Sequence, residues 1–223
     1  MISVIIPVLN EASTLDAALR RLRDTDADVE VIVVDGGSDD ATIDIAQRYA
    51  IAVEAPCGRA TQMNEGARLA RGGTLLFVHA DARLPCNWAD AVSTAVDSGA
   101  VAGTFAQVID APGPAYRLIE RAGNFRARRL GLFYGDAGVF VTREAFDRAG
   151  GFPEVAIGEE FGFSRAVRAL GRTVVLESTV HVSPRRWQRH GIVRVTLTNW
   201  LITLLLHTGV PPTRVARLYD AVR

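Results

Sequence analysis

Short apolar runs alternate with amphipathic segments over the first hundred residues. The apolar runs are rich in β-branched residues and predict strands over residues 2–6, 29–34, 51–53 and 75–78. The segments between them predict helices over residues 13–22, 41–49 and 59–71, and a fourth begins after Asn87. Ser13 and Asp16 have the spacing of a capping box for the first helix. Such alternation with short connections predicts an α/β fold with a doubly wound, mostly parallel sheet.

The second half is less regular but contains the same two kinds of segment. Strands are predicted over residues 101–109, 138–141 and 173–176. Helices are predicted over residues 114–130, 143–149, 159–170 and 192–207, and Thr142 is the expected cap of the second of these. No repeat or linker interrupts the pattern, so we expect one domain over residues 1–223.

The charges balance overall but are divided between the two halves. The 25 basic residues equal the 25 acidic ones; residues 1–100 hold 15 acids and 8 bases, and residues 101–223 hold 10 and 17. This balance argues against nucleic acid as a partner. Every basic residue is Arg, which excludes a Walker-A loop, a pyridoxal Schiff base and a protein kinase, because each of these requires a Lys.

The N-terminal residues and the two cysteines favour a cytoplasmic protein. The first apolar run has no basic leader and is interrupted by Pro7, unlike a signal peptide. Cys57 and Cys86 have neither redox-motif nor zinc-site spacing. The most apolar window, residues 200–206, is far shorter than the ~20 residues that a membrane-spanning helix needs.

Two common catalytic motifs are missing. No G-x-G-x-x-G follows a predicted strand, which argues against a nicotinamide or flavin site. Ser164 lies in a sequence similar to a nucleophile elbow, but it falls inside a predicted helix rather than on a strand-to-helix turn. A hydrolase triad is therefore not expected.

Carboxylates at the ends of predicted strands are the stronger functional signal. Asp35 ends one buried strand, and the sequence His79-Ala80-Asp81 ends another. Ligands of open α/β sheets bind beyond the carboxyl ends of the strands, and a hard cation with a diphosphate needs only one or two carboxylates there. Asp35 either accepts hydrogen bonds from a base or ribose, or starts the Asp-Gly-Gly turn. Asp81 either binds a cation or simply terminates its strand.

A pair of acids, Glu159 and Glu160, opens a predicted helix in the second half. Acids in a first helical turn often interact with the helix dipole alone. Alternatively, one of the pair is a general base whose pKa is set by burial or a nearby cation.

Several motifs, taken in order, resemble a family-2 glycosyltransferase of the GT-A fold. The matching segments are residues 3–11 (SVIIPVLNE), 31–39 (VIVVDGGSD), 76–81 (LFVHAD), 150–153 (GGFP) and 159–160 (EE). Residues 58–66 and 183–189 are similar to a branch of short bacterial members, named as transferases associated with radical-SAM and selenium-domain proteins. The resemblance implies a nucleotide-binding part over residues 1–100, an acceptor and catalytic part over 101–190, and C-terminal helices over 191–223.

The resemblance also implies residue roles. Donor-binding residues would be Pro7, Val8, Glu11, Asp35, Arg59, Asn64, Asp81, Arg185, Arg186 and Trp187. Asp81, with His79 as a weaker ligand, would hold Mn²⁺ or Mg²⁺ against the diphosphate. Glu160, with Glu159 beside it, would be the base, and Gly135 and Asp136 would contact the acceptor.

The implied activity is a metal-dependent, inverting transfer from a nucleotide-diphosphate sugar, a UDP-sugar being favoured, to an unidentified hydroxyl acceptor. Two features depart from the family pattern. The metal motif reads His-Ala-Asp instead of having two flanking acids, and Glu160 stands where the family has Asp. The alternative is a catalytically weak nucleotide-sugar-binding protein that acts in an assembly.

The apolar segment over residues 192–207 leaves three alternatives open. It packs in the core, forms a homodimer interface, or docks on lipid as an interfacial helix at the inner membrane face. Arg185, Arg186, Arg189 and Arg194 lie near it in sequence and suit anionic headgroups.

Overall fold

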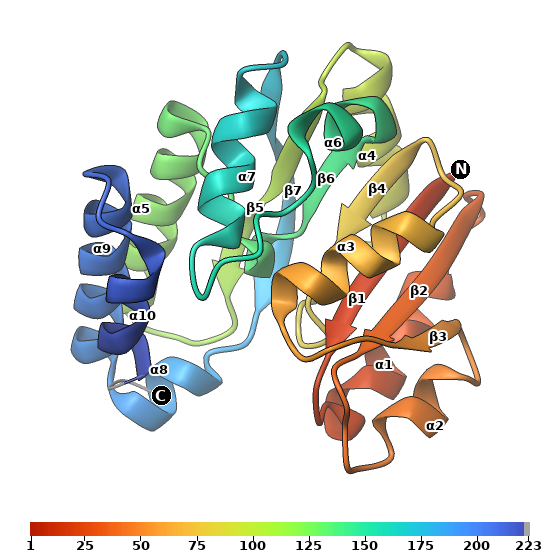
Figure 1. Cartoon of the computed structure of the whole chain (residues 1–223), viewed down its shortest axis with the longest axis horizontal. Helices are drawn as coiled ribbons and strands as arrows, with labels where there is room; N and C mark the ends of the chain where they lie inside the picture. Colours follow the sequence, from red (N-terminus) through yellow and green to blue (C-terminus); the bar gives the residue numbers. More distant parts are fainter. Residues whose placement is uncertain (221–223) are drawn as a thin grey trace.

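The computed structural model describes residues 1–220. Its centre is one seven-stranded sheet (Figure 1). Its strands are β1 (Ile2–Val8), β2 (Val29–Asp35), β3 (Ile51–Glu54), β4 (Thr74–Phe77), β5 (Ala102–Ile109), β6 (Val139–Thr142) and β7 (Thr173–Val182). They are arranged in the order β3-β2-β1-β4-β6-β5-β7. Strands β1 to β4 are parallel, as is the pair β5–β7, whereas β6 is antiparallel to both of its neighbours. The predicted mostly parallel sheet is confirmed.

Helices cover both faces of this sheet. They are α1 (Ala12–Arg23), α2 (Thr42–Ala46), α3 (Arg59–Leu69), α4 (Trp88–Asp97), α5 (Pro114–Leu130), α6 (Arg143–Ala149), α7 (Glu159–Arg168), α8 (Arg185–His190), α9 (Ile192–His207) and α10 (Pro212–Asp220), with a short 3₁₀ helix, η1 (Gly135–Ala137). Successive strand residues point to opposite faces, so Val4 and Ile6 join one buried cluster and Ile5 joins the other.

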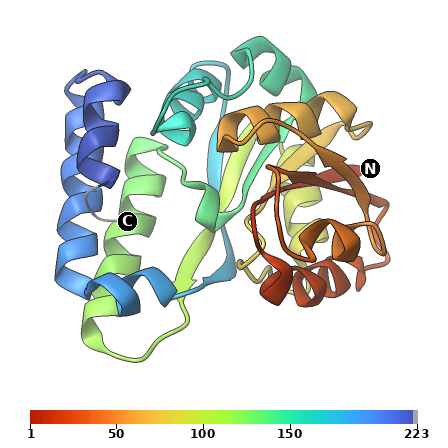
Figure 2. The ribbon, with the colours of Figure 1, turned by 60° about the horizontal axis from the view of Figure 1, so that its bottom comes forward.

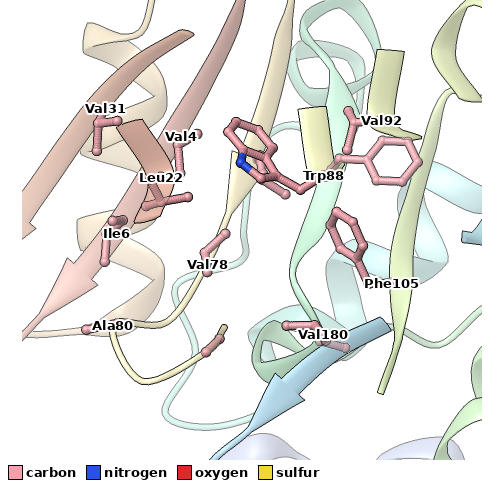
Figure 3. Packing of buried hydrophobic residues seen from close by; sticks show 14 of the residues in the cluster. Val4, Ile6, Leu22, Val31, Val78, Ala80, Trp88, Val92, Phe105 and Val180 are labelled. Atoms are coloured by element: carbon pink, nitrogen blue, oxygen red, sulfur yellow. The ribbon is translucent and has the colours of Figure 1, made fainter. Parts of the chain in front are cut away.

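The two clusters divide the helices between the faces. The first contains Leu19 of α1 and Trp88 of α4, as Figure 3 shows for Trp88. The second contains Met63 of α3 and Phe163 of α7. Helices α9 and α10 pack at the end of the molecule away from β3, where Val215 of α10 lies in a third cluster (Figure 2). No helix within residues 1–220 is both long enough and apolar enough to cross a membrane.

Three local predictions are corrected by the structure. Helix α1 begins at Ala12 with Glu11 at its cap, so the capping box of Ser13 is wrong; Asp16 pairs with Arg20 instead. Helix α2 ends at Ala46 rather than at residue 49. Strand β7 continues to Val182 rather than ending at residue 176. Phe105 pairs with Leu176 but Ala106 pairs with Thr179, so Glu177 and Ser178 form a bulge within the strand.

Other local predictions are confirmed. Thr142 caps α6 by accepting a hydrogen bond from the Ala145 amide. Ser164 lies inside α7 and is fully buried, which agrees with the exclusion of a nucleophile elbow. Helices α5 and α9 span the predicted ranges.

Candidate active site

The carboxyl ends of β1 and β2 are tied together by side chains from the loops that follow them. The backbone amide of Asn10 donates to Ser38 Oγ at 2.8 Å, and Asn10 Oδ1 accepts from the Asp39 amide at 3.0 Å. Asn10 has a φ of 55°, a left-handed conformation that Asn tolerates well. The two loops therefore form one rigid wall at this edge of the sheet.

Asp35 stabilises the turn that follows β2. One carboxylate oxygen accepts from the amides of Gly37 and Ser38 at 2.9 and 2.8 Å, and the other accepts from Ser38 Oγ. The residue is only 2% exposed. Its contact with a base remains a prediction.

Glu11 and Pro7 lie at the same edge of the sheet. Glu11 Oε2 accepts from Thr14 Oγ1 at 2.8 Å, while the Glu11 amide donates to Thr42 Oγ1 at 2.9 Å. Both Glu11 and Pro7 are half-buried. They remain accessible to a ligand at this edge, as predicted for donor-binding residues.

Two of the predicted donor-binding residues make structural contacts within the protein. The side chain of Val8 is buried in the first core cluster. The amide of Asn64 is bonded at both ends to the backbone of Phe152, at 2.8 and 2.9 Å, and holds α3 against the Gly-Gly-Phe segment. For both residues the predicted nucleotide contact remains a prediction, and the contacts that the structure shows are with the protein itself.

Gln62 is a site-forming residue that sequence reasoning missed. Its Nε2 donates to the carbonyls of Val8 and Val34, both at 2.8 Å, from a buried position on α3. It thereby fixes the ends of β1 and β2 relative to α3. In the sequence, Gln62 could have been found as a polar residue on the side of a predicted helix that otherwise faces the core.

A buried pair of acids lies across from the strand ends. Glu159 and Glu160 open α7 after Gly158 and are each 6% exposed. Arg59, at the start of α3, reaches both: its Nη1 lies 3.3 Å from Glu159 Oε1 and 3.5 Å from Glu160 Oε1. The sequence predicts Arg59 as a nucleotide or phosphate ligand, whereas the structure places it on the acids.

Burial sets the proton affinity of Glu160. Loss of solvation, together with the negative charge of Glu159, raises the pKa of Glu160 to about 7, and Arg59 opposes part of this rise. A carboxyl group with a pKa near neutrality is suited to accept a proton from a hydroxyl group at physiological pH. Glu160 therefore has the electrostatic character of a general base.

Gly135 packs closely against Glu160 and against His79 of the loop after β4. A Cβ atom on Gly135 would lie 2.7 Å from Glu160 Oε1 and 2.8 Å from His79 Nε2, so no side chain fits there. His79 is half-buried, and loss of solvation together with the charge of Arg59 lowers its pKa to about 3, which makes the ring neutral. Among the described residues its Nε2 has no hydrogen-bond partner. The fold thus brings together residues 79, 135 and 160, which are far apart in the sequence.

Asp136 adds a third acid, which is half-buried. Its Oδ2 accepts from Gln107 Nε2 at 2.8 Å, and burial raises its pKa. Its Oδ1 has no hydrogen-bond partner within residues 1–220. Ser164 of α7 fixes the loop that carries these residues, because its Oγ accepts from the Phe133 amide at 3.0 Å. The loop and α7 are therefore positioned together.

Asp81 lies at the opening of a surface groove. The groove has a volume of about 400 Å³ and is lined by residues of α1, the loop after β4 and the end of β7. Asp81 is partly exposed, and its Oδ2 lies 3.6 Å from Arg185 Nη2. The structure therefore brings Asp81 and Arg185 together, as predicted for groups that share a diphosphate.

Arg186 and Trp187, which follow Arg185 in the sequence, are also predicted to bind the donor. Trp187 packs edge-on against Tyr116, with ring centroids 6.4 Å apart, and joins the border of the first core cluster. Its contact with the diphosphate remains a prediction. Arg186 follows Arg185 on the short helix α8, and its role in donor binding remains a prediction.

The donor set suits a cation that is shared with a ligand. Within residues 1–220, no group of three or more His, Cys, Asp or Glu side chains is gathered so that it could hold a metal ion. Asp81 supplies one accessible carboxylate, and divalent cations are commonly bound by one or two carboxylates together with substrate phosphates. His79 Nε2 points instead towards Gly135 and Glu160. The residues therefore fit a cation completed by a diphosphate, with Asp81 as its protein ligand.

Solved structures of glycosyltransferases share this architecture. The mannosyltransferase PcManGT from Pyrobaculum calidifontis, in complex with GDP-Man and Mn²⁺, matches with a TM-score of 0.71 and 22% identity over 99% of this chain and 69% of that one. S. aureus TarS with UDP-GlcNAc matches with a TM-score of 0.65 and 16% identity, over 97% and 70% of the two chains. Glucosyl-3-phosphoglycerate synthase from Mycobacterium tuberculosis, with Mn²⁺ and UDP, has a TM-score of 0.62 and 21% identity, over 95% and 81%. The fold is that of a GT-A glycosyltransferase.

The sequence defines the family. Residues 3–150 match the model of glycosyl transferase family 2, and the chain belongs to that family. A PGL/p-HBAD biosynthesis glycosyltransferase of Mycobacterium tuberculosis is 43% identical over 90 residues, which is 36% of this chain and 35% of the relative. The match thus spans about a third of that curated relative. The family is therefore established over residues 3–150; the more specific resemblance to the radical-SAM and selenium-associated branch remains a prediction.

Proposed function

We propose that this chain transfers a sugar from a nucleoside diphosphate sugar to a hydroxyl acceptor, with inversion at the anomeric carbon and with a divalent cation. The observation that carries the proposal is Glu160, a buried carboxyl group with a pKa of about 7 that packs against Gly135. UDP-sugars are the preferred donor class because two of the three solved structures described above hold a uridine nucleotide.

The donor binds at the carboxyl ends of β1, β2 and β4. Pro7, Glu11 and Asp35 lie at the nucleoside end of this edge, and Asp81 with Arg185 lies at the diphosphate end. When bound, Mn²⁺ or Mg²⁺ neutralises the charge that builds on the departing nucleoside diphosphate. Arg185 is 3.6 Å from Asp81 and adds a second positive group at that end.

Glu160 acts on the acceptor. It takes the proton of the acceptor hydroxyl while the oxygen forms a bond to the anomeric carbon, and the bond from that carbon to the diphosphate oxygen breaks. Attack opposite the leaving group inverts the configuration. Gly135 and Asp136 border the acceptor, and Arg59 holds the acids of α7 in position through contacts at 3.3 and 3.5 Å.

A panel of nucleotide sugars, measured by calorimetry with and without Mn²⁺, tests the donor and the cation. We expect UDP-sugars to bind in the presence of Mn²⁺ and to bind more weakly without it. Release of UDP on addition of an acceptor-containing extract is expected of a transferase. Binding of UDP-sugars without any UDP release would favour the catalytically weak binding protein, and binding of GDP-sugars alone would contradict the choice of donor.

Replacing Gly135 by Ala is expected to lower the transfer rate by about 100-fold and to destabilise the fold by about 1–3 kcal/mol through overpacking. The new methyl group would lie within 2.8 Å of Glu160 Oε1 and His79 Nε2, so the carboxylate must move, and a displacement of about 1 Å can cost a factor of this size. Gly73→Ala is the matched control, because a Cβ there meets nothing within 4 Å. Steady-state kinetics and thermal melts of both variants check this; unchanged kcat in Gly135→Ala would remove Glu160 from the reacting centre.

A further inference from the structure

The outward side of α9 is apolar. Five large residues form it: Val193, Leu197, Trp200, Leu201 and Leu204. Their spacing of three, four and seven residues places them in one stripe along the helix. Val193 is 71% exposed and Leu197 57% exposed, whereas Val195 and Ile202 on the other side are buried in the protein. The helix is therefore apolar on both sides, although the part of the chain that the structure describes covers only one.

This stripe is too large to be a chance feature of a solvated surface. From residue 193 to residue 204 it extends for about 17 Å along the helix, at about 1.5 Å per residue. A helix that is apolar all round normally has both sides covered. Contiguous apolar surfaces of this kind mark contact sites for a protein or a membrane.

The charges around the stripe indicate which of these covers it. Residues 178–219 contain six Arg and no Asp or Glu. Helix α5 runs beside α9 in both views of the fold (Figures 1 and 2). Its exposed side carries Leu118 and Phe125 together with Arg121 and Arg128. Large apolar residues with Arg and no acid are the composition of a surface that contacts anionic headgroups.

We propose that α9 docks this chain on the surface of an anionic lipid membrane. The apolar stripe enters the boundary between headgroups and acyl chains, and the Arg side chains beside it contact lipid phosphates. Trp200, which is 45% exposed, has the amphipathic ring that is enriched at this boundary. A second copy of the chain suits the stripe less well, because a two-fold interface would place the acid-free, Arg-rich segments of both copies side by side.

Vesicle sedimentation of the whole chain tests the proposal. We expect binding to vesicles of phosphatidylcholine with phosphatidylglycerol, and much weaker binding to phosphatidylcholine alone. Leu197→Glu should weaken binding by at least about 10-fold, because it removes a large apolar side chain from lipid. Arg189→Gln should weaken it by about fivefold, the effect of one basic residue near an anionic surface. Ile51→Glu is the matched control, since this exposed residue lies on β3 at the opposite end of the molecule.

Two further measurements separate docking from the alternatives. A blue shift of fluorescence on vesicle binding should come mainly from Trp200, since Trp88 is buried and Trp187 packs against Tyr116, and Trp200→Phe should remove most of the shift. Light scattering should show a monomer. A dimer that Leu197→Glu dissociates would assign the stripe to a second copy and overturn the proposal. Equal binding to both vesicle types, or no binding to either, would overturn it as well.

Discussion

Replacing Glu160 by Gln is expected to lower kcat by about 100- to 10,000-fold while donor affinity stays nearly unchanged. Gln has the same shape but cannot accept the proton of the acceptor hydroxyl, and a positioned base commonly contributes a factor of this size. The donor is held at the strand ends, so its affinity does not depend on this carboxylate. Kinetics with UDP release as readout, together with calorimetry of the donor, measure the two effects.

The adjacent acid provides the control. Glu159→Gln removes a carboxylate that also contacts Arg59, at 3.3 Å, without removing the proposed base. We expect a smaller loss of kcat and a lower pKa for Glu160, because Glu159 is one of the charges that raise it. In the wild type, kcat/KM should rise as the pH passes about 7, where Glu160 ionises. Near wild-type turnover in Glu160→Gln would exclude Glu160 as the base and direct attention to Glu159 or Asp136.

The pH dependence of protein stability tests whether the Glu160→Gln variant is folded. The pKa of Glu160 is raised from 4.5 to about 7 on folding. The protonated form is therefore favoured in the folded state, and its contribution to stability is present below about pH 4.5 and is lost as the pH rises through about 7. Because Gln never ionises, Glu160→Gln should unfold no more easily than the wild type at pH 8.

Replacing Asp81 by Ala is expected to weaken Mn²⁺-dependent binding of UDP by more than about 100-fold. Even partners that only support a metal ligand contribute about 10- to 100-fold, and Asp81 is the one accessible carboxylate that we propose as a direct ligand. Binding of UDP without metal should not fall, since Arg185 loses its acidic partner at 3.6 Å and keeps its charge. Calorimetry with and without Mn²⁺ distinguishes the two cases.

A second acid in the same groove makes this prediction specific. Asp110 also lines the groove, but it pairs with Arg83 and His181. Asp110→Ala should therefore leave metal-dependent binding close to that of the wild type. If Asp81→Ala bound UDP and Mn²⁺ with unchanged affinity, the cation would have to be held elsewhere, and the proposed role of Asp81 would be wrong.

Local patterns in the sequence identify most of the elements but misplace some of their ends. Alternating apolar runs and capping residues are local signals, so the predicted helix over residues 114–130 and the cap at Thr142 agree with the structure. The end of β7 depends on its partner instead. Glu177 and Ser178 fit into a strand only because the register with β5 shifts there, and this pairing is invisible along the chain.

The candidate site residues also divide into those that local sequence identifies and those that depend on tertiary contacts. Asp81 and Glu160 are identifiable because acids beyond a strand end and at a helix start are informative at short range. The contacts of three other residues are not identifiable in this way, because they depend on the parts of the fold that lie opposite. Val8 packs in a core cluster, Asn64 bonds to the Phe152 backbone, and Trp187 packs against the Tyr116 ring. Gln62 was missed for the same reason, because its two carbonyl partners come from different strands.

The sequence by itself determined the α/β class, the acids available for catalysis and the exclusion of every mechanism that needs a Lys. The tertiary structure decided which of those acids become unusual. Glu160 has a raised pKa because folding buries it next to Glu159, and Gly135 matters because folding brings it against Glu160 and His79. Solvation and close contact are properties of groups that are distant in sequence, so only the packed chain fixes them.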